Sequence, residues 1–154
     1  MPHLLSESGA MRLLVDLVTR ERDSGRVVAT CAVEWLDRRD GEWWPFVRLP
    51  VVHLQPGTAE ALVSGLREVL QGVVPGFSWA AGEAAAFALQ VGAAESGSAV
   101  IEVGIDLGAF LSESAGVSAP RGDELALFRF AAARAELVRF AGQVEEQVAS
   151  VTEQ

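Results

Sequence analysis

The chain has 154 residues, half of them hydrophobic, and its 12 basic and 21 acidic residues give a net charge of −9. This length predicts about one domain, and no apolar run approaches the roughly 20 residues of a membrane-spanning helix. So acidic a surface repels phosphate backbones and anionic lipid, so neither nucleic acid nor a membrane is expected as a partner.

The start of the chain is expected to lie outside the folded domain. Residues 1–10 show no sustained apolar alternation, so we expect a flexible N-terminal tail. They also lack the basic cluster and long apolar stretch of a signal peptide, so a cytoplasmic location is expected. A single α+β domain is then predicted over residues 11–152.

Three strands are predicted between this tail and the first helix. Apolar residues alternate over 11–20 and again over 26–37, which is the period of a strand. A third extended segment covers 42–54. Pro45 and Pro50 cannot donate a ladder hydrogen bond, so this segment is expected to be an edge strand, or two short strands with a bulge between them.

One helix is predicted near the middle of the chain, over residues 58–71. Apolar residues recur there at spacings of three and four, which gives the helix an apolar face that can cover a sheet. Thr58 is the expected N-cap, and Gly72 is expected to end the helix. A short strand is predicted to follow at 77–79.

The clearest pattern in the chain is a β-hairpin over residues 84–110, with its turn at 95–98. Odd positions on both arms are apolar, whereas the even positions include Gln90, Glu102 and Asp106. This alternation predicts a buried odd face, which we expect to pack under one of the helices. The even face is mixed and partly acidic, and is therefore better suited to contact than to chemistry.

The end of the chain leaves two alternatives open. Residues 111–123 predict the longest loop. We then prefer a strand from 124 to about 131 followed by a helix over 134–151, and one continuous helix is the alternative. The predicted fold class is α+β, a mostly antiparallel sheet of about six to seven strands covered by one central helix and a C-terminal helix.

The chain is poor in residues that carry out catalysis. It has no lysine and no tyrosine, which excludes Schiff-base chemistry and a P-loop. Cys31 lies inside a predicted strand and is expected to be a small buried hydrophobe. His53 has no second histidine or cysteine at a ligand spacing, so no metal site is expected. Neither an enzymatic activity nor a cofactor is therefore predicted.

Two adjacent tryptophans are candidate partner-binding residues. Trp43 and Trp44 follow the predicted Asp-Gly turn, and neighbouring residues of a strand point to opposite faces. One ring is therefore expected in the core and the other on the surface, where it would anchor an interface. The alternative is a ring packed over Arg39 or Arg48.

Carboxylates in the second half of the chain form another candidate. Residues 78–154 carry 4 arginines and 11 acidic residues, a net charge of −7, against −2 for the first 77 residues. A basic partner surface would complement them, and a merely solvated face is the alternative. The acidic residues expected to contact a partner are Glu102, Asp106, Asp123 and Glu124.

Several segments taken together resemble a bacterial family. They are 77–79, Gly82-Glu83, the alternating runs 85–91 and 100–107, and 136–140. With these segments in this order, the chain resembles the small bacterial domains typified by WapI-type immunity proteins and their uncharacterised relatives. The resemblance implies a cytoplasmic protein that binds and neutralises a toxin domain, often a nuclease, through an acidic surface. It supplies no catalytic residues.

The sequence therefore predicts a non-enzymatic protein-binding domain, with a basic toxin domain as the partner in the immunity interpretation. The alternative is a structural or assembly subunit of a homo- or hetero-oligomeric bacterial complex. In that case the proline-broken strand, the tryptophan pair or the last helix would pack against another subunit.

Overall fold

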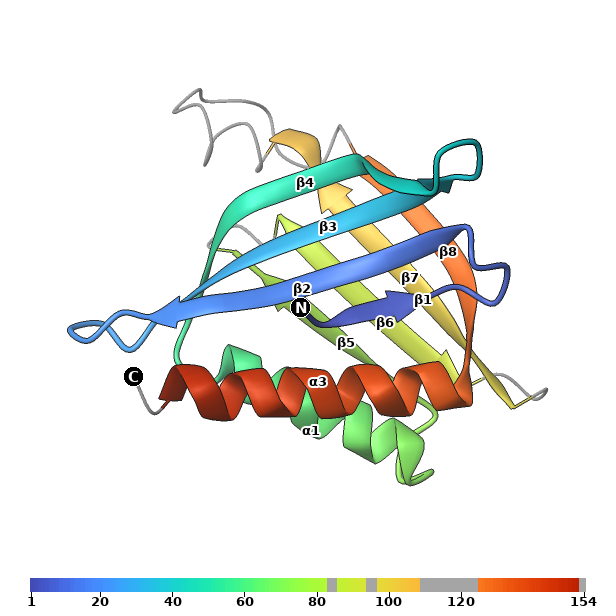
Figure 1. Cartoon of the computed structure of the whole chain (residues 1–154). Coiled ribbons are helices and arrows are strands. Elements are labelled where there is room, and N and C mark those ends of the chain that lie inside the picture. The colour runs from blue at the N-terminus through green and yellow to red at the C-terminus, as the bar shows by residue number, and fades with distance from the viewer. Residues whose placement is uncertain (83–85, 94–96, 109–124, 153–154) are drawn as a thin grey trace.

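The computed structural model describes residues 1–82, 86–93, 97–108 and 125–152. These residues form two four-stranded antiparallel sheets together with helices α1 (Thr58–Leu70) and α3 (Arg134–Thr152) (Figure 1). Sheet A contains, in spatial order, β1 (His3–Leu5), β2 (Met11–Arg20), β3 (Val27–Asp37) and β4 (Glu42–Leu54). Sheet B contains β5 (Gly76–Ala81), β6 (Phe87–Ala93), β7 (Ser98–Asp106) and β8 (Leu125–Ala133).

The predicted α+β class is confirmed, with the strands divided between two sheets. In Figure 1 the two sheets face each other with their strands crossing, and both helices lie at one end of the molecule. One continuous core joins the inner faces of both sheets to the apolar faces of both helices. Each sheet therefore buries its inner face in this core.

The N-terminal residues depart from the predicted flexible tail. His3–Leu5 forms β1, which pairs with β2. Leu4 lies opposite Leu13, and both side chains are fully buried. Three residues are too few for alternation to appear in the sequence, so this strand was missed, and the described structure contains eight strands where about six to seven were expected.

The strands of sheet A agree closely with the sequence pattern. β2 and β4 have the predicted bounds, and β3 begins one residue later than expected. β4 is an edge strand, as its prolines predicted, and its register against β3 shifts at two points. The shift between Val33 and Glu34 brings Pro45 opposite Glu34, so the proline lies at an irregularity of the ladder.

Helix α1 begins one residue away from the predicted cap. Gly57 is the N-cap, with φ of 87°, and no side chain caps the helix. The prediction of Thr58 as N-cap is therefore wrong, because the chain enters the helix through a left-handed backbone conformation that favours glycine. The other end is as predicted: the helix stops before Gly72, whose φ is 72°.

The later elements confirm the preferred interpretation of the sequence. The odd positions of β6 and β7, among them Phe87, Leu89 and Ile101, are buried, except for Ala93 at the end of β6, which is exposed. They belong to the common core, which includes sheet A as well as both helices. β8 is a strand and α3 follows it directly, so the alternative of one continuous helix is wrong. The predicted loop at 111–123 lies outside the described residues.

Within the described ranges, no helix has both the length and the apolar character to cross a membrane.

Candidate binding face

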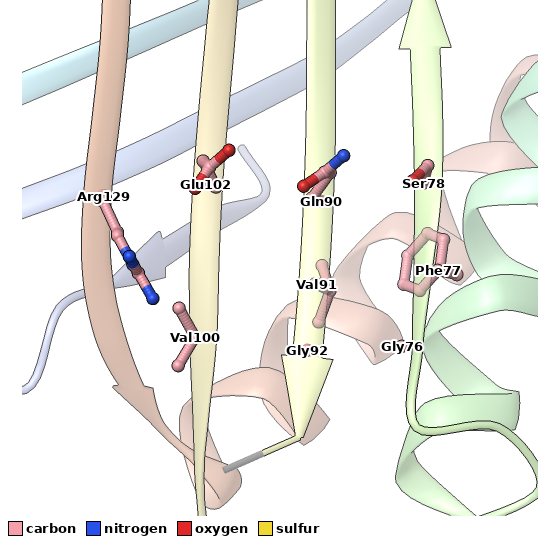
Figure 2. A pocket seen from close by; sticks show the side chains of 9 residues that line it. All are labelled: Gly76, Phe77, Ser78, Gln90, Val91, Gly92, Val100, Glu102 and Arg129. Atoms are coloured by element: carbon pink, nitrogen blue, oxygen red, sulfur yellow. The ribbon is translucent and has the colours of Figure 1, made fainter.

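The outer face of sheet B carries one row of polar side chains that crosses all four strands. The register places Ser78 opposite Gln90, Gln90 opposite Glu102, and Glu102 opposite Arg129 (Figure 2). The residues that flank them along β6 and β7, such as Leu89 and Ile101, point inward and are buried. The period of two in the hairpin therefore assembles this row from residues up to 51 positions apart.

Small residues lie on both sides of the polar row. On one side Gly76, Gly92 and Val100 stand opposite one another, and on the other side Ala88, Gly104 and Leu127 do so. The three glycines and Ala88 leave the sheet backbone close to the surface, because glycine has no side chain and alanine has only a methyl group. Two hollows result, of about 380 and 350 Å³, both bordered by Gln90 and Glu102.

The two hollows differ in chemistry. The first, which we call the arginine hollow, is lined by Gly76, Phe77, Ser78, Gln90, Val91, Gly92, Val100, Glu102 and Arg129 (Figure 2). The second, which we call the leucine hollow, is lined by Ala88, Gln90, Glu102, Gly104, Asp106, Leu125 and Leu127. A basic side chain therefore borders one hollow, and two carboxylates and two leucines border the other.

The glycines of the arginine hollow are not equivalent. A Cβ on Gly76 would lie 2.7 Å from the carbonyl oxygen of Val91, so the backbone packing itself requires glycine there. A Cβ on Gly92 would meet nothing within 4 Å. The space above Gly92 is thus open, and it is bounded only by side chains at its rim.

The polar side chains of this face are not engaged with one another. Within the described ranges, no hydrogen bond or ion pair involves the side chain of Ser78, Gln90, Glu102 or Arg129. Arg129 extends toward Val100 and away from the carboxylate of Glu102 (Figure 2). Since Ser78, Gln90 and Arg129 are exposed, neither helix nor the other sheet covers them. Their donors and acceptors are available to a molecule that approaches from outside.

Two of the predicted site residues lie on this face. Glu102 and Asp106 both border the leucine hollow, as their spacing along one strand face implied. Asp123 and Glu124 lie outside the described residues. Gln90 had been placed on the same mixed face from the sequence, whereas Arg129 had not been singled out.

The predicted tryptophan pair lies elsewhere, on sheet A. Trp43 is half-buried beneath Arg12, whose Cζ lies 4.2 Å from the ring centroid, and Trp44 is 47% exposed. Neither ring is part of the core, so the expectation that one of them enters it is wrong. Trp43 and Trp44 lie at the start of β4, next to the β3–β4 turn. The arginine over Trp43 is Arg12 and not Arg39 or Arg48.

Sequence reasoning missed Arg129 and the leucines of β8 because they come from a strand far along the chain. Leu125 and Leu127 are 64% and 58% exposed. The signal that could have found them is the alternation in β8, where odd residues oppose the even residues of β7. To use this alternation, one must know how β8 pairs with β7. The sequence pattern of a single strand does not contain that register.

Other chemically reactive groups do not form a second site. Cys31 is fully buried as predicted, and burial raises the pKa of its thiol to about 12. His53 lies on β4 with Nε2 3.9 Å from Oε1 of Glu21. In the part of the chain that the structure describes, no group of three or more histidine, cysteine or carboxylate side chains is arranged to hold a metal ion.

Comparison with known proteins gives no family. No family model matches the chain, and no curated protein matches it either. Among solved structures, the chain is similar to the trypanosome proteins MRP1/MRP2, with 10% sequence identity and a TM-score of 0.49. That alignment covers 91% of this chain and 84% of the other.

Proposed function

We propose that this chain is a non-enzymatic protein-binding domain that contacts its partner through the outer face of sheet B. The observation that carries the proposal is that four polar side chains of this face, Ser78, Gln90, Glu102 and Arg129, have no side-chain partner among the described residues. Elsewhere in the structure, partly buried arginines such as Arg20 and Arg139 are engaged with carboxylates. An open face with unengaged donors and acceptors is suited to forming hydrogen bonds with a second molecule.

The shape of the face favours a protein partner. Hollows of about 380 and 350 Å³ adjoin each other along β6 and β7 and share Gln90 and Glu102 at their common border. Side chains of a partner would enter the hollows, and its polar groups would meet the row between them. Phe77 and Val100 supply apolar contact in the arginine hollow. Apolar contact bordered by polar groups is typical of protein interfaces.

Charge favours a partner with a basic surface. Glu102 and Asp106 border the leucine hollow, and the whole chain has a net charge of −9. A charge of this size would steer a basic partner and raise its association rate. The resemblance to immunity proteins agrees with this inference, so the specific form that we propose is neutralisation of a basic toxin domain.

A steric block tests the proposal most directly. The partner to test is the toxin domain, if any, encoded beside this gene, and binding is measured by calorimetry. Gly92→Phe adds a ring at the arginine hollow, at a position where the new Cβ meets nothing within 4 Å. The matched control is Gly142→Phe on α3, where a Cβ also meets nothing within 4 Å. We expect Gly92→Phe to weaken binding at least about tenfold, or 1.4 kcal/mol, and Gly142→Phe to bind as the wild type does.

Two results would contradict the proposal. One is the absence of affinity for any adjacent toxin, which would remove the immunity interpretation. The other is equal binding by Gly92→Phe and the wild type, which would show that the partner does not contact the outer face of sheet B. Binding that does not weaken with added salt would contradict the role of charge, because attraction between exposed charges is screened.

A further inference from the structure

The two sheets have four edges, and the edge at β1 and β2 is closed by side chains of α3. The backbone N–H of Leu17 donates to Oε1 of Gln147 at 2.6 Å, and the N–H of His3 donates to Oε1 of Gln143 at 3.3 Å. Arg139 donates to the carbonyl of His3 at 3.1 Å. Exposed strand edges are templates for pairing with another chain, so these contacts protect the edge.

Two further edges are protected by other means. β4 contains two prolines and two register shifts, and a strand interrupted in this way is a poor template for regular pairing. β5 lies beside α1, where Nε1 of Trp79 donates to the carbonyl of Thr58 at 2.8 Å and the ring of Phe77 packs over Gly65.

The remaining edge, at β8, lacks these protections in the described structure. The nine residues of β8 contain no proline, and Arg129 is their single charge. One backbone contact reaches its outer edge, from the N–H of Glu7 to the carbonyl of Ala131 at 2.8 Å. Backbone groups alternate between the two edges of a strand, so those of Leu125, Leu127 and Arg129 also point away from β7.

We propose that a second copy of this chain pairs with this edge, β8 antiparallel to β8, and extends sheet B across a two-fold axis at Leu127. Leu127 then faces its own equivalent, and Leu125 faces Arg129 of the second copy. The backbone groups of Leu125, Leu127 and Arg129 point away from β7. Each of these residue pairs can therefore form two hydrogen bonds between the two copies. The leucines, 64% and 58% exposed in the single chain, would cover each other across the axis.

The neighbouring registers are less favourable. An axis at Arg129 would place two guanidinium groups directly opposite each other, which is destabilising. An axis at Phe128 would pair Leu125 with Ala131, whose carbonyl already accepts a hydrogen bond from Glu7. The axis at Leu127 avoids both conflicts and stays within the described strand.

Charge complementarity supports a second copy as the occupant of this edge. Arg129 has its own Glu102 opposite it on β7. In the proposed register it would face Leu125 of the second copy, and Asp106 is the residue beside Leu125 on β7. Arg129 would therefore lie between carboxylates of both copies. Although the whole chain is acidic, no acidic residue lies on β8 itself, so two copies meet there without opposed carboxylates.

Charge substitution at the axis tests the pairing, with sedimentation at micromolar concentrations as the measurement. We expect the wild type to form a dimer. Leu127→Glu and Leu127→Lys should each be monomeric, with dimer affinity reduced at least about tenfold, because each places like charges face to face. A mixture of the two variants should recover a heterodimer. Val138→Glu, at a residue 51% exposed on α3, is the matched control and should remain a dimer.

The possible outcomes separate the alternatives. A wild type that stays monomeric, a Leu127→Glu variant that stays dimeric, or a mixture that fails to pair would each overturn the proposal. Far-ultraviolet circular dichroism shows whether each variant keeps its fold. Gly92→Phe, the block for partner binding, should leave the dimer intact, so failure of this inference and failure of the proposed function are distinguishable.

Discussion

The two sheets each carry an arginine directly opposite a glutamate on the outer face, and the two pairs behave differently. In sheet A, Arg12 opposes Glu34, and Nε donates to Oε1 at 2.7 Å. In sheet B, Glu102 opposes Arg129, and no ion pair joins them. The same residue types in the same cross-strand relation thus give one closed contact and one open one.

The neighbouring side chains account for the difference. Arg12 lies over the ring of Trp43, which holds the guanidinium in place beside Glu34. Arg129 has Val100 and the open space above Gly92 beside it, and no ring supports it (Figure 2). The side chains beside an arginine and a glutamate therefore decide whether the two form an ion pair or stay available for binding. Their cross-strand register alone does not decide it.

The largest expected effect comes from the glycines of sheet B. If packing alone required the glycines on the outer face of sheet B, every one of them would resist substitution. Gly76→Ala should lower the free energy of unfolding by about 2 to 3 kcal/mol, because its Cβ would lie 2.7 Å from the backbone oxygen of Val91. Gly92→Ala should change it by less than about 0.5 kcal/mol. Urea unfolding measures both, and equal losses would show that the hollow is a packing requirement.

The second effect concerns the two arginine–glutamate pairs. A double-mutant cycle of Arg12→Ala and Glu34→Ala should give a coupling energy of about 1 kcal/mol, since both side chains are partly buried and their hydrogen bond is charge-assisted. The same cycle on Glu102 and Arg129 should give about zero. Chemical denaturation at moderate salt gives both couplings. A coupling in sheet B as large as that in sheet A would contradict the open state of this face.

The sequence predicts the strands better than the surfaces they form. Alternation located β2, β3, β6 and β7 and their buried faces, because a strand of seven or more residues repeats its period often enough to be seen. The three residues of β1 repeat nothing. Division into two sheets also escaped prediction, because the sequence pattern does not contain the pairing of distant strands.

The candidate face was predicted only on the hairpin. Glu102 and Asp106 were found because they belong to one strand, and Gln90 because it lies on the adjoining arm. Arg129 comes from β8, and its position beside Glu102 depends on the register. Trp43 and Trp44 were chosen for their chemistry, yet Trp43 lies beneath Arg12 on the other sheet. The alternative of an arginine packed over one of the rings is confirmed, but the arginine is Arg12 and not Arg39 or Arg48. Binding of a partner by the tryptophan pair stays a prediction.

The smallest effect is a pH dependence at the edge of sheet A. Hydrogen bonds from Arg39 hold the pKa of Asp37 below its usual value. A lowered pKa in the folded state stabilises the fold above the unfolded pKa, and this contribution is lost as the pH falls through the folded pKa. The urea midpoint of the wild type should therefore fall more steeply below about pH 4 than that of Asp37→Asn. If Asp37→Asn kept the wild-type slope, the ion pair at Asp37 would contribute nothing measurable to folding.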